Sequence, residues 1–231
     1  MSQLRVLVTG GGRGIGRAIA LRFAREKAKV TVCARSSPEL DAVIKEIDAA
    51  GGLGRAQQMD VADHGSVEAA VWRAVEFLDG AIDVLVNNAG MFEIQSIEQM
   101  DIALWNRMIA VNLSGAFYVT NEALDPLFEG TRPHVFNIAS VAARQGFAGN
   151  TAYCASKYGL RGFSDALRLD LAPRGVRVST VYPGPTNTTM AAKLPSSFDR
   201  TKLAQPEAVA EVVWRAYNAP AGTHVDDLDV P

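Results

Sequence analysis

Tyr153 and Lys157 are the two side chains of this sequence whose types and spacing best suit proton transfer. They stand four residues apart in a stretch with helical periodicity, so both project from one helix face. A free tyrosine has a pKa near 10, which is too high for a base at neutral pH. An ammonium about 4 Å away is worth roughly 4 kcal/mol at an effective dielectric constant of about 20, or about three pKa units. The pair therefore predicts a tyrosine of pKa about 7 that serves as general acid or base; the alternative is an ordinary exposed pair.

Two polar residues upstream extend this set. Ser140 ends the strand-like run 135–139 and comes thirteen residues before Tyr153. Asn112 lies inside a long helical pattern, where asparagine is neither a good helix former nor a natural core residue. It is therefore either exposed or part of a site.

A glycine-rich stretch near the start of the chain suits a phosphate. The aliphatic run 4–8 is followed by Gly10-Gly11-Gly12-Arg13-Gly14-Ile15-Gly16 and then by helical spacing, which predicts a strand, a tight turn and a helix. The turn offers backbone N–H groups and the positive end of a helix dipole, and glycine avoids a Cβ that would hold a pyrophosphate away. A purely structural turn is the alternative reading.

The remaining elements that must position these residues alternate along the chain. The order βαβαβα, without repeats or a linker, predicts one domain over 1–231 with a single doubly wound, Rossmann-like parallel sheet and helices on both faces. The polar segment 186–204 is interpreted as a mobile substrate flap. Further strands are expected at 30–34, 82–86, 135–139, 176–181 and 225–230, and helices at 38–50, 66–78 with Ser66 as its cap, 101–127, about 151–171 and 206–217.

Composition narrows the classes of function. The 231 residues carry a net charge of -2, with 48% hydrophobic and 21% charged residues, which fits a soluble globule without a basic nucleic-acid footprint. The two cysteines form neither a metal spacing nor a disulfide framework, so we expect no metal and a reducing cytoplasm. No signal peptide or membrane-spanning stretch is expected.

Two further positions fall where strands of such a sheet end. Asn87-Asn88-Ala89-Gly90 follows the strand 82–86, and open α/β sheets bind ligands at that edge, although a plain turn is also possible. The strand 30–34 ends in Ala34-Arg35, where an acid usually holds the 2′-hydroxyl of NAD. Asp60-Val61 stands before the next helix.

Together these motifs resemble the short-chain dehydrogenase/reductase family. The resemblance rests on T-G-G-G-R-G-I-G, Asp60-Val61, N-N-A-G, Asn112, Ser140, Y-C-A-S-K and P-G-P-T-N-T-T-M, in order over almost the whole chain. The compact branch, similar to 3-oxoacyl-carrier-protein reductases and carbonyl reductases, fits best. The tail departs from the pattern: it lacks the Gly-Gly segment of many relatives and is short, which suggests a more open pocket.

The resemblance implies roles for individual residues. Tyr153 would be the general acid/base for the substrate oxygen, Ser140 would hydrogen-bond that oxygen, Lys157 would hold the nicotinamide ribose and lower the tyrosine pKa, and Asn112 would hold a water linked to Lys157. The implied cofactor-binding residues are Gly10, Arg13, Gly14, Ile15, Gly16, Arg35, Asp60, Val61, Asn88, Ala89, Tyr153, Lys157, Pro183, Gly184, Thr186 and Thr188.

NADP(H) is the expected cofactor, with NAD(H) less favoured. No acid stands at Ala34, and Arg35 and Arg13 offer guanidinium groups, which bind phosphate oxygens in pairs. Two solvated arginines and an indifferent site are the alternative.

The sequence as a whole predicts an NADP(H)-dependent oxidoreductase that moves a hydride between nicotinamide and a small-molecule carbonyl or secondary alcohol. A non-catalytic dinucleotide sensor or scaffold is the alternative, although it would need no proton relay. An epimerase or dehydratase of the larger related branch is disfavoured by the glycine spacing and the absence of a second substrate domain.

Apolar positions suggest partners and a pocket. A homodimer or homotetramer is expected from seven residues of the two long helices, which are Leu104, Trp105, Met108, Phe117, Phe163, Leu167 and Leu171. Six further residues are expected either to line the substrate pocket or to pack in the core: Met91, Phe92, Gln145, Phe147, Pro185 and Met190. The three histidines, His64, His134 and His224, match no motif and are expected on the surface.

Overall fold

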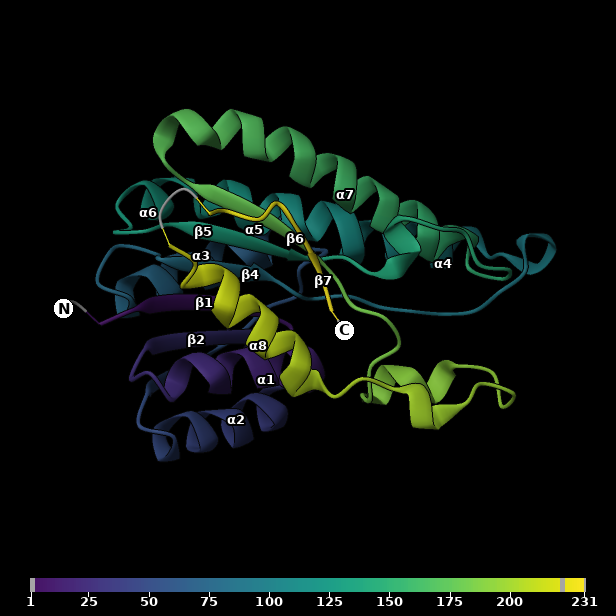
Figure 1. Ribbon diagram of the computed structural model, residues 1–231, viewed down its shortest axis with the longest axis horizontal. Coiled ribbons are helices and arrows are strands. Elements are labelled where there is room, and N and C mark those ends of the chain that lie inside the picture. Colours follow the sequence, from purple (N-terminus) through teal and green to yellow (C-terminus); the bar gives the residue numbers. More distant parts are fainter. Residues whose placement is uncertain (1–2, 221–222, 231) are drawn as a thin grey trace.

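The chain forms one seven-stranded, all-parallel sheet in the order β3-β2-β1-β4-β5-β6-β7, with helices on both faces (Figure 1). This computed structural model describes residues 3–220 and 223–230, so the ends of the expected 1–231 domain and residues 221 and 222 lie outside the described residues. The strands are β1 (Arg5–Thr9), β2 (Lys29–Ala34), β3 (Leu53–Gln58), β4 (Val84–Asn87), β5 (His134–Ile138), β6 (Arg177–Tyr182) and β7 (Asp227–Asp229). The predicted fold class is confirmed.

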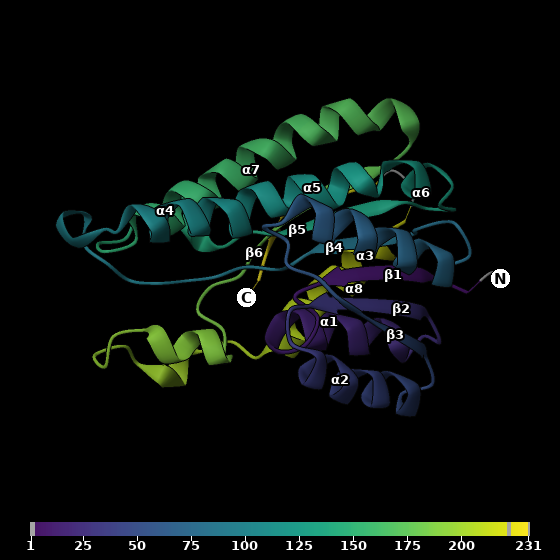
Figure 2. The ribbon, with the colours of Figure 1, turned by 180° about the vertical axis from the view of Figure 1, so that it is seen from behind.

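Helices cover both faces of the sheet, as the views from the two sides show (Figures 1 and 2). One face carries α1 (Gly14–Ala24), α2 (Ser37–Ala49) and α8 (Pro206–Tyr217); the other carries α3 (His64–Phe77), α5 (Gly115–Glu122) and α7 (Thr151–Leu171). The remaining helices are α4 (Ile102–Ile109), the π-helical turn η2 (Ala110–Ser114), α6 (Leu124–Phe128) and the short 3-10 turns η1 (Ile97–Gln99), η3 (Val141–Ala143), η4 (Ala172–Arg174), η5 (Thr189–Lys193) and η6 (Arg200–Lys202).

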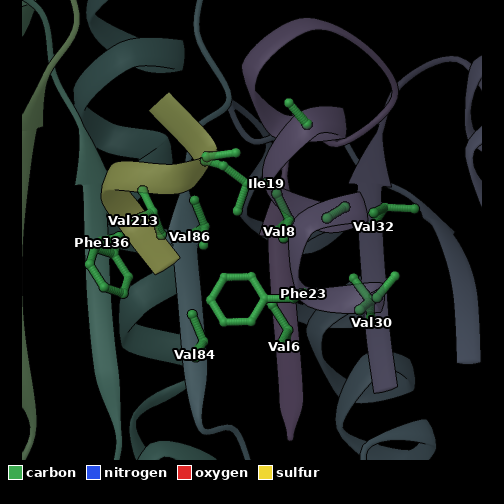
Figure 3. Packing of buried hydrophobic residues seen from close by; sticks show 14 of the residues in the cluster. Val6, Val8, Ile19, Phe23, Val30, Val32, Val84, Val86, Phe136 and Val213 are labelled. Carbon is green, nitrogen blue, oxygen red and sulfur yellow. The ribbon is translucent and has the colours of Figure 1, made fainter. Parts of the chain in front are cut away.

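The two cores follow from the alternation of side chains along β1. Val6 and Val8 pack with Ile19 and Phe23 of α1 and with Val213 of α8, whereas Leu7 belongs to the cluster on the opposite face (Figure 3). Alternate residues of a strand point to opposite faces, and a parallel strand covered by helices is apolar on both. The sheet is therefore buried between two helical layers.

The predicted continuous helix over 101–127 is wrong. The chain forms α4, then the π-helical turn η2, then α5, which ends at Glu122 before α6. Pro126 in α6 has no N–H to donate to the carbonyl of Glu122, so an α-helix cannot run through this point. The π turn contains Asn112, whose side chain is buried.

Two smaller predictions are also wrong. Ser66 does not cap α3: the helix begins at His64, and the carboxylate of Asp63 accepts the N–H of Ser66. His134 is not a surface residue, because it begins β5, which lies between β4 and β6, and its buried ring stacks on Phe136. His64 is exposed as expected, and His224 is half-buried.

Candidate active site

All of the predicted site residues lie at one edge of the sheet. Because every strand is parallel, the segments that follow the strands all leave the sheet at its carboxyl edge. These segments contain the glycine turn after β1, Arg35 after β2, Asn88 after β4, Ser140 after β5 and Pro183 after β6. The chain order reverses between β1 and β4, which is where open α/β sheets bind ligands.

The glycine turn is held by Asn88 from the neighbouring strand. The Asn88 side-chain amide donates to the carbonyl oxygens of Thr9 at 2.9 Å and Gly10 at 3.1 Å. A Cβ on Gly10 would stand 2.8 Å from this amide nitrogen, and Gly10 has a φ of +63°. Gly16 has no room for a Cβ beside the Gly10 carbonyl. Contacts within the protein therefore also require glycine at Gly10 and Gly16, in addition to the expected close approach of a pyrophosphate.

The start of α1 has no side-chain cap, as is also the case for α2, α7 and α8. Arg13 occupies the N-cap position of α1 without a capping hydrogen bond, and no acid stands in the first turn. By contrast, Asp63 caps α3 and Asp101 caps α4. The free N–H groups and positive dipole end of an 11-residue helix suit an anion. The residues present therefore fit a dinucleotide pyrophosphate.

Charged residues surround the place where β2 and β3 end. Arg13 pairs with Glu39 at 3.1 Å. Arg107 of α4 reaches Asp60 at 2.7 Å. Burial raises the pKa of Asp60, but the hydrogen bonds from Arg107 and from the N–H of Ala62, together with the charges of Arg107 and Arg35, hold that pKa below its usual value. Arg35 itself is exposed.

Val61 and Ala89 lie on the buried side of this charged edge. Val61 is buried against the first residue of α5, Gly115, where an added Cβ would stand 2.9 Å from the Val61 side chain. The N–H groups of Asn88 and Ala89 both donate to the Thr9 hydroxyl at 3.0 Å. Ile15 packs partly buried against the core under α1.

Asn112 is buried and its side chain is fully engaged. Its oxygen accepts the N–H of Met91 at 2.7 Å, and its amide donates to the Met91 carbonyl at 2.9 Å and to the Ser156 hydroxyl at 3.0 Å. The Ser156 hydroxyl donates in turn to the carbonyl of Tyr153. Asn112 thus joins η2, the segment after β4 and the N-terminal part of α7.

Tyr153 lies between Ser140 and Phe92. Burial raises the pKa of Tyr153, and side-chain hydrogen bonding with Ser140 lowers it only in part. The Phe92 ring meets the Tyr153 ring edge to face, with centroids 4.8 Å apart. The Ser140 hydroxyl also accepts the N–H of Ala142 at 3.1 Å, which holds it at the start of η3.

Lys157 is buried and turns toward the end of β5. Its Nζ donates to the carbonyl of Ile138 at 2.8 Å and stands 5.9 Å from the centre of the Tyr153 ring. Burial lowers the pKa of Lys157 to about 8. The prediction that Lys157 brings the pKa of Tyr153 to about 7 is therefore wrong for this structure. The ammonium donates to the carbonyl of Ile138, and burial raises the pKa of Tyr153 above its usual value.

The segment after β6 also borders the candidate site. The carbonyl of Pro183 accepts the N–H of Val141 at 3.1 Å, beside Ser140. The Thr186 hydroxyl donates to the Gly184 carbonyl at 2.9 Å. Thr188 faces the glycine turn: a Cβ on Gly14 would stand 3.0 Å from its methyl carbon. The four predicted residues 183, 184, 186 and 188 therefore lie between the glycine turn and the Ser140 segment.

The six residues expected in the substrate pocket or the core differ in their exposure. Met91 and Phe92 are half-buried beside Asn112 and Tyr153, whereas the four others, Gln145, Phe147, Pro185 and Met190, are exposed.

Three residues that hold the candidate site together were not predicted from the sequence. Thr9 gathers two backbone N–H groups, Ser156 connects Asn112 to Tyr153, and Arg107 holds Asp60. Thr9 and Ser156 stand inside the quoted motifs, so their hydroxyl groups were a usable signal. Arg107 had none, because its partner is 47 residues away.

Comparisons with known proteins agree with this fold and site. The sequence profile described as short chain dehydrogenase matches residues 5–198. The 2,5-dichloro-2,5-cyclohexadiene-1,4-diol dehydrogenase LinX of Sphingobium indicum is 37% identical over 199 residues, covering 86% of this chain and 79% of its own length. The 3-oxoacyl-[acyl-carrier-protein] reductase FabG of Thermotoga maritima is 35% identical over 215 residues, covering 90% of this chain and 87% of its own.

A solved structure matches almost completely. A variant of actinorhodin polyketide ketoreductase with NADPH superposes with a TM-score of 0.92 at 34% identity, covering 99% of this chain and 95% of that one. The chain belongs to the short-chain dehydrogenase/reductase family, a family of oxidoreductases. In the described part of the chain, no helix combines the length and apolarity needed to cross a bilayer.

Proposed function

We propose that the protein is an NADP(H)-dependent oxidoreductase that transfers a hydride between nicotinamide and a carbonyl or secondary alcohol. The observation that supports this most is the meeting of Ser140, Tyr153, Lys157 and Asn112 at the carboxyl ends of the strands, beside an uncapped helix N-terminus. The substrate in this proposal is a small molecule.

In this mechanism the chain orients the substrate oxygen and moves one proton. Ser140 hydrogen-bonds that oxygen, and Tyr153 gives it a proton in reduction or takes one in oxidation. A tyrosine of raised pKa is protonated at neutral pH, which suits the reductive direction. Lys157 stands ready to reprotonate the site, because burial brings its pKa to about 8. Asn112 positions the helix turn that carries Tyr153.

The bound cofactor supplies or accepts the hydride. Its pyrophosphate would be held by the start of α1 at Gly14, Ile15 and Gly16, and its adenosine end by Arg35, Asp60 and Val61, with Arg13 nearby. Asn88 and Ala89 would flank the adjoining ribose, and Lys157 with Tyr153 the nicotinamide ribose. The loop residues Pro183, Gly184, Thr186 and Thr188 would border the nicotinamide.

We also propose how the protein is organised and where it acts. Residues 1–231 act as one domain with 186–204 as a mobile flap, and two or four copies associate through the helical layer of α4, α5 and α7. Both cysteines are free thiols, which fits the reducing cytoplasm proposed as its compartment.

The test is NADPH oxidation by purified protein with a panel of ketones and diketones, followed at 340 nm. Turnover with at least one carbonyl is expected. NADPH binding without turnover on any member, in either direction, would instead favour the non-catalytic sensor.

A further inference from the structure

The flap, residues 186–204, is closed at its base and structured inside. Thr186 and Ala204 form an isolated parallel bridge. The N–H of Asn187 donates to the carbonyl of Ala204 at 2.8 Å, and the N–H of Ala204 donates to the carbonyl of Pro185 at 3.0 Å. The flap contains η5 and η6, and Arg200 donates to the carbonyl of Ala191 at 3.1 Å. Because its two ends are joined and its parts are bonded together, it is built to move as one piece.

One ion pair connects the flap to the opposite side of the site. Lys193, at the end of η5, pairs with Glu93 in the segment after β4. Among the ion pairs of the described residues, this is the one that leaves the flap: the other, between Lys202 and Asp199 at 3.8 Å, lies within it. Both partners are partly exposed, with 43% of the Lys193 side chain and 39% of Glu93 accessible.

The partner segment, residues 91–95, is fixed to the catalytic helices, and we call it the wall. Met91 is bound by Asn112 through both its N–H and its carbonyl, and Phe92 packs on Tyr153. The N–H of Gln95 donates at 2.8 Å to the carbonyl of Gly149, two residues before α7. The wall is therefore tied to the segments that hold Tyr153, whereas the ion pair that joins the flap to the wall is partly exposed.

The flap and the wall project from the same side of the molecule, beyond the carboxyl ends of the strands, in both views (Figures 1 and 2). Glu93 adjoins Phe92, which touches Tyr153, and the flap also carries Thr188, which faces the glycine turn. The ion pair therefore joins the flap to the segment whose Phe92 touches Tyr153.

We propose that Glu93 and Lys193 form an electrostatic gate between wall and flap, and that this gate determines which substrates reach Tyr153. The inference rests on the proposed function for the reaction that it gates. With the pair intact, small carbonyls are favoured; when it is broken, bulkier ones gain access. Exposed pairs are weak and are screened by salt, so the gate opens readily during turnover.

The first experiment measures opening without using activity. Chymotrypsin cleavage after Phe198, a half-buried residue inside the flap, is followed by mass spectrometry. Glu93→Gln and Lys193→Gln should each accelerate this cleavage about two- to fivefold, the size expected for an exposed pair. The swapped double variant Glu93→Lys/Lys193→Glu should return it to near the parent rate. Lys202→Gln removes a flap lysine whose partner is inside the flap, so it should leave cleavage unchanged.

The second experiment measures selectivity with cyclohexanone and the bulkier 2-decalone. Each single variant should raise the ratio of kcat/KM for 2-decalone over cyclohexanone about two- to fivefold. In the parent, 0.5 M NaCl should raise the same ratio, and in the variants it should have little effect.

Cleavage at the parent rate in both single variants, or failure of the swap to restore it, would overturn the gate. An unchanged selectivity ratio with faster cleavage would overturn its role in substrate choice. If no carbonyl is turned over at all, the proposed function fails, while the cleavage rates still decide whether the ion pair holds the flap.

Discussion

The ammonium of Lys157 donates to the main-chain oxygen of Ile138, 2.8 Å away, rather than resting against the phenol of Tyr153. Ile138 is the last residue of β5, two positions before Ser140. The lysine therefore ties α7 to the strand that precedes the serine, and its Nζ stands 5.9 Å from the centre of the Tyr153 ring. This arrangement predicts how kcat/KM should depend on pH.

Tyr153→Phe keeps the ring and its contact with Phe92 while removing the proton donor. Turnover should fall by at least about 100-fold, the low end for loss of a general acid. NADPH affinity, measured by fluorescence titration, should stay within about twofold of the parent, because the ring is retained. A variant that keeps most of its turnover would contradict the proposed mechanism.

Alcohol oxidation should speed up toward alkaline pH. As a base, Tyr153 must be ionised, and burial raises its pKa above the usual value, so the ionised fraction still grows well above neutrality. We expect kcat/KM for oxidation to rise without a plateau near pH 7, whereas reduction holds up there because the tyrosine stays protonated. Profiles of both directions between pH 6 and 10 provide the measurement. A plateau in the oxidation profile at about pH 7 would support the lysine-lowered pKa instead.

Local spacing was enough to predict the glycine turn, the Tyr153–Lys157 helix face and the parallel sheet. These features depend on residues close together in the chain or on the periodicity of single elements. The direction of the Lys157 side chain depends on β5, and Asn112 is buried because a segment 21 residues earlier bonds to it. Contacts of this kind come from tertiary packing, which overrides the low helix preference of asparagine.

His134 illustrates the same limit. A lone polar residue before a strand is usually exposed, but the structure buries it against Phe136, with its Nε2 2.9 Å from the Ser179 hydroxyl. Burial, together with the positive charge of Arg177, keeps the pKa of His134 well below its usual value. The unfolded chain therefore binds more protons than the folded chain below about pH 6.5.

This burial predicts a loss of stability on acidification. Between the lowered folded pKa of His134 and the unfolded value near 6.5, the free energy of unfolding should decrease as the pH falls. His134→Gln keeps an N–H donor without a titratable ring, so its urea midpoint should fall less than that of the parent between pH 7.5 and 5.5. Equal losses in the two proteins would show that His134 does not contribute.

Assembly should depend on the layer of α5 and α7. Of the seven apolar residues expected to serve assembly, Met108, Leu167 and Leu171 are buried in the protein's own core, whereas Phe117 is 48% exposed and packs on Phe163. We expect a dimer or tetramer by light scattering at micromolar concentration, and dissociation in Phe117→Asp. Trp72→Asp, at a 68% exposed position on α3, is the control and should leave the mass unchanged. A monomeric parent would refute the assembly.

Cofactor choice should follow Arg35 more than Arg13. The Arg13 guanidinium is engaged by Glu39, whereas Arg35 is exposed at the end of β2 and close enough to lower the pKa of Asp60. A hydrogen bond to a charged group contributes about 1.5–3 kcal/mol, so one contact to a 2′-phosphate favours NADPH over NADH by roughly 10- to 100-fold.

The measurement is kcat/KM for NADPH and NADH with one substrate. The parent should prefer NADPH, and Ala34→Asp/Arg35→Ala should move the preference toward NADH, because the new carboxylate repels a 2′-phosphate and accepts a hydrogen bond from a free 2′-hydroxyl. Arg13→Ala should change the ratio less, since Glu39 already offsets its charge. Equal use of both cofactors by the parent, or an unchanged ratio in the double variant, would rule out Arg35 as the determinant.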